Sequence, residues 1–110
     1  MKIVLDTNVF TSGIFFTGPP NTILKAWRDG RIQILISEEI IEEYRRVGEL
    51  LARQFPRIEL GPVLQLLAIN AEFVRPKKLT AQACKDPDDD KFLKCAISGK
   101  SDLIVSGDNH

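Results

Sequence analysis

Three short segments of this 110-residue chain are apolar along almost their whole length, and they constrain its fold more than any other feature. They are KIVL at residues 2–5, IQILI at residues 32–36 and LIV at residues 103–105. Strands that are apolar on both faces are typical of parallel sheets buried between two layers of helices. The intervening segments carry helical spacing, so strands and helices alternate along the chain. The predicted fold is therefore α/β, a three-layer α/β/α sandwich with a central parallel sheet.

The boundaries of the helices follow from capping and breaking residues. Ser37 is expected to cap a helix that continues to about residue 51, and Gly99 is expected to be the C′ residue that follows the last helix. Further helices are expected from residue 21 to Gly30 and over residues 60–72. The segment TSGIFFTGPPN, residues 11–21, is rich in glycine and proline and predicts a loop.

Composition bounds the class of protein. With 44% hydrophobic and 27% charged residues the chain should fold, and its length fits a single domain over residues 1–110. Fifteen basic and fifteen acidic residues cancel, so a polyanionic partner must be bound locally. No segment approaches the ~20 apolar residues of a membrane span, and no cleavable signal is visible, so we expect a cytoplasmic protein. Two cysteines and one histidine argue against a disulfide framework or a zinc site.

Carboxylates are thus the main reactive groups, and two of them follow strands. Asp6 ends the first strand, and Asp108 follows the last one, separated from it by Ser106 and Gly107. Ligands of open parallel sheets bind at the carboxyl ends of the strands, so both side chains should enter one crevice if those strands are neighbours.

Other acids lie on helices or before them. Glu42 and Glu43 are adjacent in the helix after Ser37, about 100° apart around its axis, so one can face the crevice while the other faces water. Glu43 lies at the edge of the apolar stripe and is the better candidate. The stretch CKDPDDDKF, residues 84–92, adds four aspartates, which are either a solvated acidic loop or a source of a further ligand.

Several carboxylates around one crevice require a cation, because like charges raise each other's pKa. Oxygen ligands without histidine or cysteine suit Mg²⁺ or Mn²⁺, and metal-assisted phosphodiester hydrolysis is a natural chemistry. A calcium-binding loop beginning at Asp86 is excluded, because Lys91 stands where glycine is needed and Ile97 where glutamate is needed. A phosphotransferase with a nucleophilic Asp6 stays an alternative, although Asn8 replaces the second aspartate that such enzymes need.

Four segments in order resemble the characteristic segments of a PIN domain: IVLDTNVFTSG, ISEEIIEEYRRV, DPDDDKFLKCA and DLIVSGD. The resemblance covers essentially the whole chain and is closest to the bacterial and archaeal toxin components of toxin–antitoxin pairs. It implies an α/β/α sandwich and a Mg²⁺- or Mn²⁺-dependent ribonuclease that acts on single-stranded RNA. It also implies a homodimer and a protein antitoxin as partners.

The resemblance assigns roles residue by residue. It makes Asp6, Glu43, Asp90 and Asp108 the catalytic and metal-binding acids, with Asp90 chosen from the acidic stretch because it opens a helix eighteen residues before Asp108. The remaining matched residues are expected to support the site without holding the metal: Thr7, Asn8, Asp86 and Ser106.

The end of the chain departs from the family pattern. Family members usually continue beyond the position of His110 with another strand and often a helix, so the resemblance implies a sheet edge that a partner chain could cover. A catalytically inactive PIN-like domain that binds RNA or serves as a scaffold is the alternative function.

Overall fold

The computed structural model describes residues 1–76 and 90–106. The strands in this part of the chain are β1 (Lys2–Leu5), β2 (Gln33–Ile36), β3 (Glu72–Phe73) and β4 (Leu103–Val105). The helices are α1 (Thr7–Phe15), α2 (Pro19–Arg28), α3 (Glu38–Ala52), α4 (Leu60–Asn70) and α5 (Asp90–Ser98).

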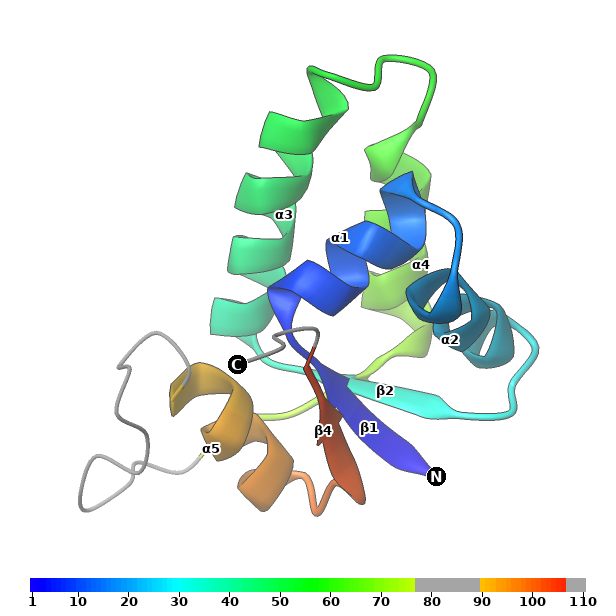
Figure 1. Ribbon diagram of the computed structural model, residues 1–110. Coiled ribbons are helices and arrows are strands. Elements are labelled where there is room, and N and C mark those ends of the chain that lie inside the picture. Colours follow the sequence, from blue (N-terminus) through cyan, green and yellow to red (C-terminus); the bar gives the residue numbers. More distant parts are fainter. Residues whose placement is uncertain (77–89, 107–110) are drawn as a thin grey trace.

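The strands form one sheet in the order β3-β2-β1-β4, and each neighbouring pair is parallel. In Figure 1, α5 lies on one side of the strands, and α2 and α4 lie on the other. The sheet is thus the middle layer of an α/β/α arrangement, which confirms the predicted fold class.

The order of the strands reverses at β1. The chain moves outward from β1 through β2 to β3, and it then returns to the opposite side of β1 as β4. This reversal is a topological switch point, and in open α/β sheets ligands bind there, outside the carboxyl ends of the strands. The backbone amide of Asp6 donates to the carbonyl of Val105 at 3.0 Å, so the ends of β1 and β4 meet where the first predicted acid lies.

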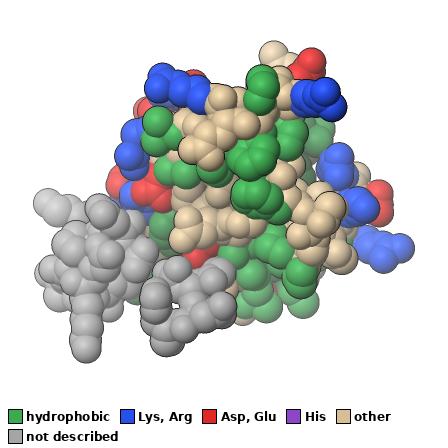
Figure 2. Space-filling view, turned by 45° about the horizontal axis from the view of Figure 1, so that its top comes forward, with side chains coloured by type: hydrophobic (Ala, Val, Ile, Leu, Met, Phe, Trp, Pro, Cys, Tyr) green, Lys and Arg blue, Asp and Glu red, His purple; other side chains and the backbone are tan. Residues whose placement is uncertain are grey.

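The core lies between the sheet and the helices on its two faces. Val4, Leu5 and the run from Ile34 to Ile36 are fully buried, as the apolar strands require. Burial of each such aliphatic side chain contributes about 1.5–3 kcal/mol. Hydrophobic side chains also reach the surface: Figure 2 shows them gathered across the middle of one face, with Lys and Arg side chains toward its margins. None of the helices in residues 1–76 and 90–106 is long and apolar enough to cross a membrane.

The loop predicted over residues 11–21 is wrong, because helix α1 extends to Phe15 and α2 begins at Pro19, so that the two helices together occupy most of the segment. Asp6 caps α1 by accepting a hydrogen bond from the Val9 amide at 2.8 Å. Gly13, which had indicated a loop, lies inside α1 at a close contact with α2. A Cβ atom there would come within 2.6 Å of Leu24 Cδ1.

The prediction for Gly99 is also wrong. Its backbone is not left-handed; the residue with positive φ after α5 is Lys100, at 56°. Gly99 instead permits close packing, because a Cβ atom there would lie 2.7 Å from Leu35 Cδ1 and 2.9 Å from Val74 Cγ2. The missing side chain lets the end of α5 approach β2.

Candidate functional site

Asp6 is fixed at the carboxyl end of β1 by its own helix cap. Its backbone is extended, with φ of −69° and ψ of 166°, and one carboxylate oxygen accepts from the Val9 amide at 2.8 Å. The partial positive charge at the start of a helix favours a carboxylate in this position. Asp6 is therefore fixed by its cap at the carboxyl end of β1, beside the end of β4.

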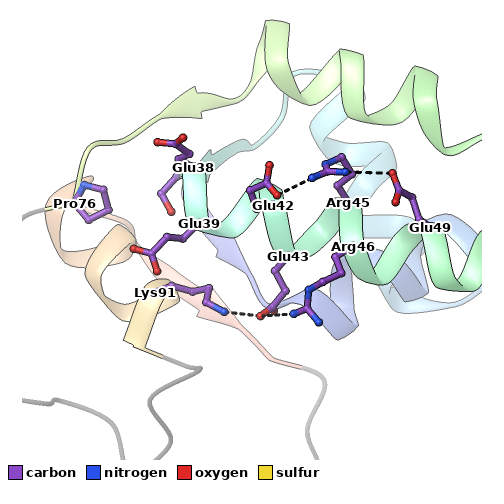
Figure 3. A pocket seen from close by; sticks show the side chains of 10 residues that line it. Glu38, Glu39, Glu42, Glu43, Arg45, Arg46, Glu49, Pro76 and Lys91 are labelled. Carbon is purple, nitrogen blue, oxygen red and sulfur yellow. Dashed lines mark hydrogen bonds and ion pairs between the residues drawn. The ribbon is translucent and has the colours of Figure 1, made fainter.

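The side chain of Glu43, in α3, contacts side chains from α1 and α5 as well as one from its own helix. Its Oε2 accepts a hydrogen bond from the hydroxyl of Thr7 in α1. Its Oε1 pairs with Nζ of Lys91 in α5 at 2.5 Å and lies 3.9 Å from the guanidinium of Arg46 in α3. Figure 3 shows Lys91 and Arg46 reaching Glu43 from opposite sides. The structure thus brings Thr7, predicted as a supporting residue, directly against a predicted catalytic acid.

The surroundings of Glu43 keep it ionised. Burial by itself would raise the pKa of its carboxyl group, but the hydrogen bonds from Lys91 and Thr7 and the charges of Lys91 and Arg46 outweigh that effect. The net result is a pKa below the ordinary value of a glutamate. Glu43 is consequently a carboxylate at neutral pH, with an orientation fixed from two sides.

The neighbouring glutamate faces elsewhere. The side chain of Glu42 is 61% exposed and pairs with Arg45 at 2.7 Å on the outer face of α3, whereas the side chain of Glu43 is 15% exposed. The two residues therefore divide between water and the interior, as expected for adjacent helix positions.

Tyr44 connects α3 to the end of β1 and was not singled out by the sequence as a site residue. Its hydroxyl donates to the carbonyl of Leu5 at 2.5 Å, and its ring stacks on Phe10 with centroids 4.0 Å apart. Burial, followed by the charges of Cys95, Asp6 and Glu43, raises its pKa well above the ordinary value, so the hydroxyl stays protonated. The available signal was chemical: a tyrosine within an apolar stripe needs a partner for its hydroxyl.

Lys91 is the second residue that the sequence did not assign to the site. It follows Asp90 in the first turn of α5, and its side chain is 15% exposed because it turns toward Glu43. The signal was its place directly after the predicted acid of the DPDDD run. Its contact with Glu43 brings the first turn of α5, and with it Asp90, to the side of α3.

Two of the remaining predicted residues lie at the surface. Asn8 is exposed in the first turn of α1, and Ser106 is exposed just beyond β4. Asp86 and Asp108 lie outside the described residues. Within residues 1–76 and 90–106, no group of three or more His, Cys, Asp or Glu side chains is arranged to hold a metal ion.

The chemistry of the donors nevertheless fits one class of metal. Asp6 and Asp90 offer carboxylate oxygens, the ligands preferred by Mg²⁺ and Mn²⁺. Cys95 is buried, and burial followed by the charge of Glu72 raises its pKa to about 11, so it is a thiol at neutral pH and a poor ligand for softer metals.

A groove of about 650 Å³ begins at Glu43 and Lys91 and follows the outer face of α3. Its other acidic lining residues are Glu38, Glu39, Glu42 and Glu49. The cations that line it besides Lys91 are Arg45 and Arg46, and both have glutamate partners. Because carboxylates outnumber cations here, this groove is a poor path for the phosphates of a nucleic acid.

Comparisons with known proteins agree with the architecture. The model of a family described as a PIN domain matches residues 2–110. The uncharacterized protein MJ1680 of Methanocaldococcus jannaschii is 32% identical over 120 aligned residues, which cover 98% of this chain and 71% of the relative. No solved structure matches the chain.

Proposed function

The chain belongs to the PIN domain family, whose members are generally nucleases that use divalent metal ions, and on this basis we propose that it is an endoribonuclease. The proposed reaction is metal-dependent hydrolysis of phosphodiester bonds in single-stranded RNA. The family membership supports the nuclease class, and the choice of RNA extends the resemblance of the four sequence segments.

One observation carries the proposal. Glu43 is held as a carboxylate by Lys91 and Thr7, beside the end of the strand that carries Asp6. The two acids come from different elements, and Asp6 lies where the strand order reverses, the position at which α/β sheets bind ligands. The partners from two other helices also fix the orientation of Glu43.

The proposed site uses Asp6 and Asp90 to hold Mg²⁺ or Mn²⁺, with Asp108 as the third predicted ligand. When bound, such an ion neutralises charge on the phosphate oxygens and eases ionisation of the attacking water. The donor set of carboxylate oxygens supports this assignment.

Glu43 would act on the attacking water. Each carboxylate oxygen has two lone pairs, so Glu43 can still accept a proton while it is bonded to Lys91 and Thr7. The water oxygen would bond to phosphorus, its proton would pass to Glu43, and the bond from phosphorus to the 3′ oxygen would break. The 3′ oxygen takes a proton from solvent, so the products are a 5′-phosphate and a 3′-hydroxyl.

Cleavage of single-stranded RNA in the presence of Mn²⁺ tests this function. Asp6→Asn, Asp90→Asn and Glu43→Gln should each lower the rate by about 10²-fold or more, a range typical for loss of a catalytic acid or base. Glu42→Gln is the matched control, since Glu42 pairs with Arg45 on the outer face and should leave the rate unchanged. Equal cleavage by the parent and the Asp6 variant would refute the site.

Two further measurements define the activity. A DNA strand of the same sequence establishes whether RNA is preferred. Mn²⁺ at 100 times its Kd should stabilise the parent by about 2.7 kcal/mol and raise its melting midpoint, an effect that Asp6→Asn should abolish. A parent that neither binds Mn²⁺ nor cuts RNA would instead be a PIN-like binding or scaffold module.

We further propose that the protein is the toxin of a toxin–antitoxin pair, and that it forms a homodimer neutralised by a protein antitoxin. The resemblance to the toxin group supports this role. Induced expression of the parent should arrest growth of a bacterial host, and Asp6→Asn should not. Light scattering of the purified chain tests the dimer, and equal toxicity of both chains would show that toxicity does not come from cleavage.

A further inference from the structure

The ion pair between Lys91 and Glu43 differs from the other ion pairs among the described residues. Both of its side chains are 15% exposed, whereas in the pairs Lys94–Glu39 and Lys2–Glu72 at least one side chain is 35% exposed or more. Surface ion pairs of that exposed kind contribute little to stability. Lys91 has therefore given up most of its hydration to lie beside Glu43.

The contacts of Lys91 show what it gains there. Its Nζ lies 2.5 Å from Glu43 Oε1 and 5.8 Å from the ring centroid of Phe92. The pair bridges 48 residues of sequence and joins the first turn of α5 to the middle of α3. An enclosed charge is costly unless it is paired, so Lys91 and Glu43 need each other.

This pairing limits how Glu43 can meet a metal ion. One oxygen of Glu43 faces the ammonium group of Lys91, and the other accepts the hydroxyl of Thr7. A divalent cation bound directly to Glu43 would lie within a few ångström of that ammonium and be repelled by it. The sequence had placed Glu43 among the metal ligands, and the geometry favours a different role.

Resting on the proposed function, we propose that Lys91 is a positioning residue that serves as the counter-cation of Glu43. It holds Glu43 toward the reacting water and keeps it from becoming a direct ligand of the metal. The metal is then held by aspartates, and the Glu43–Lys91 pair lies beside the metal without binding it. Lys91 itself touches neither the metal nor the reacting phosphorus.

Calorimetric titration of the full chain with Mn²⁺, together with single-turnover RNA cleavage, tests the proposal. Lys91→Met releases Glu43, so Mn²⁺ binding should tighten by about tenfold, which lies within the usual range of coupling between sites, while cleavage slows. Melting in EDTA should show a lower midpoint for the same variant. Simple loss of structure would weaken metal binding and cleavage together. Lys94→Met, a lysine one turn further along α5 with an exposed partner, is the matched control and should change neither.

The decisive comparison is the double variant Glu43→Gln with Lys91→Met, because it removes both charges and leaves the net charge of the pair unchanged. Its Mn²⁺ affinity should stay within about threefold of the parent, as expected when Glu43 is no ligand, although cleavage is lost. A Mn²⁺ affinity more than tenfold weaker than that of the parent would make Glu43 a direct ligand and overturn the proposal. A parent that binds no Mn²⁺ at all would overturn the proposed function itself, which is a separate result.

Discussion

At the scale of single residues, the hydroxyl of Tyr44 carries the connection between the two carboxylates of the candidate site. This hydroxyl donates to the carbonyl of Leu5, which precedes Asp6 in the chain. Tyr44 itself directly follows Glu43. Together with the hydrogen bond from Thr7 to Glu43, this bond holds the end of β1 against the middle of α3. Stacking of the Tyr44 ring on Phe10 fixes the direction of that bond, because the two rings are inclined by only 10°.

Tyr44→Phe should lower the free energy of unfolding by about 1–2 kcal/mol, because it removes the donor to a buried carbonyl while keeping the ring. Urea unfolding monitored by circular dichroism measures the change as a lower midpoint with an unchanged slope. Tyr44→Leu, which also removes the stacked ring, should cost more. If Tyr44→Phe unfolds at the same urea concentration as the parent, the bond to Leu5 contributes nothing.

At the scale of elements, the contact between α1 and α2 depends on the absence of one side chain. Gly13 lies inside α1, and a Cβ atom there would come 2.8 Å from the backbone oxygen of Pro20 and 2.6 Å from Leu24 Cδ1. A backbone atom cannot move aside as a flexible side chain can. The two helices therefore can pack at this distance only with glycine at that position.

Gly13→Ala should destabilise the fold by about 1–3 kcal/mol, the usual cost of overpacking, even though alanine is the better helix former. Ser12→Ala, one residue earlier in the same helix, is the control for helix propensity and should change stability by no more than about 0.5 kcal/mol. Thermal unfolding of the two variants side by side measures the difference. A stabilised Gly13→Ala variant would mean that α2 shifts to accept the new methyl group.

At this scale, the sequence predicted features that depend on neighbouring residues and missed features that depend on residues far away in the chain. The apolar strands and the cap at Ser37 are local, and the structure has both: Ser37 accepts from the Ile40 amide at the start of α3. Helix α1 was missed because the reason for Gly13 lies in α2. Lys91 was missed for a similar reason, since its partner is 48 residues away. Asp86 and Asp108 lie outside the described residues, so their predicted roles stay predictions.

At the scale of the whole molecule, two parts of the chain form the sheet. They add strands on opposite sides of β1. Residues 1–76 supply β1, β2, β3 and the helices that follow them, and α5 with β4 closes the other side. Phe92 and Cys95 of α5 belong to the same buried cluster as Val4 and Leu5 of β1. The core is therefore common to both parts.

A fragment of residues 1–76 should not fold on its own. It would expose the face of β1 that α5 covers and lose several core side chains, each worth about 1.5–3 kcal/mol, from a total stability that is typically about 5–15 kcal/mol. Thermal melting followed by circular dichroism should show no cooperative transition for the fragment, with the full chain as the control. A sharp melt of the fragment would show that α5 and β4 are an addition to a core that is already complete.

Because β4 follows the other described elements in the chain, the candidate site is completed late in synthesis. A ribosome releases Asp6 and Glu43 first, and Lys91 follows Glu43 by 48 residues. Until α5 and β4 have emerged, Glu43 lacks its lysine and the amide of Asp6 lacks the carbonyl of Val105. The proposed site therefore stays incomplete until Val105 and the predicted ligand Asp108 have been synthesised.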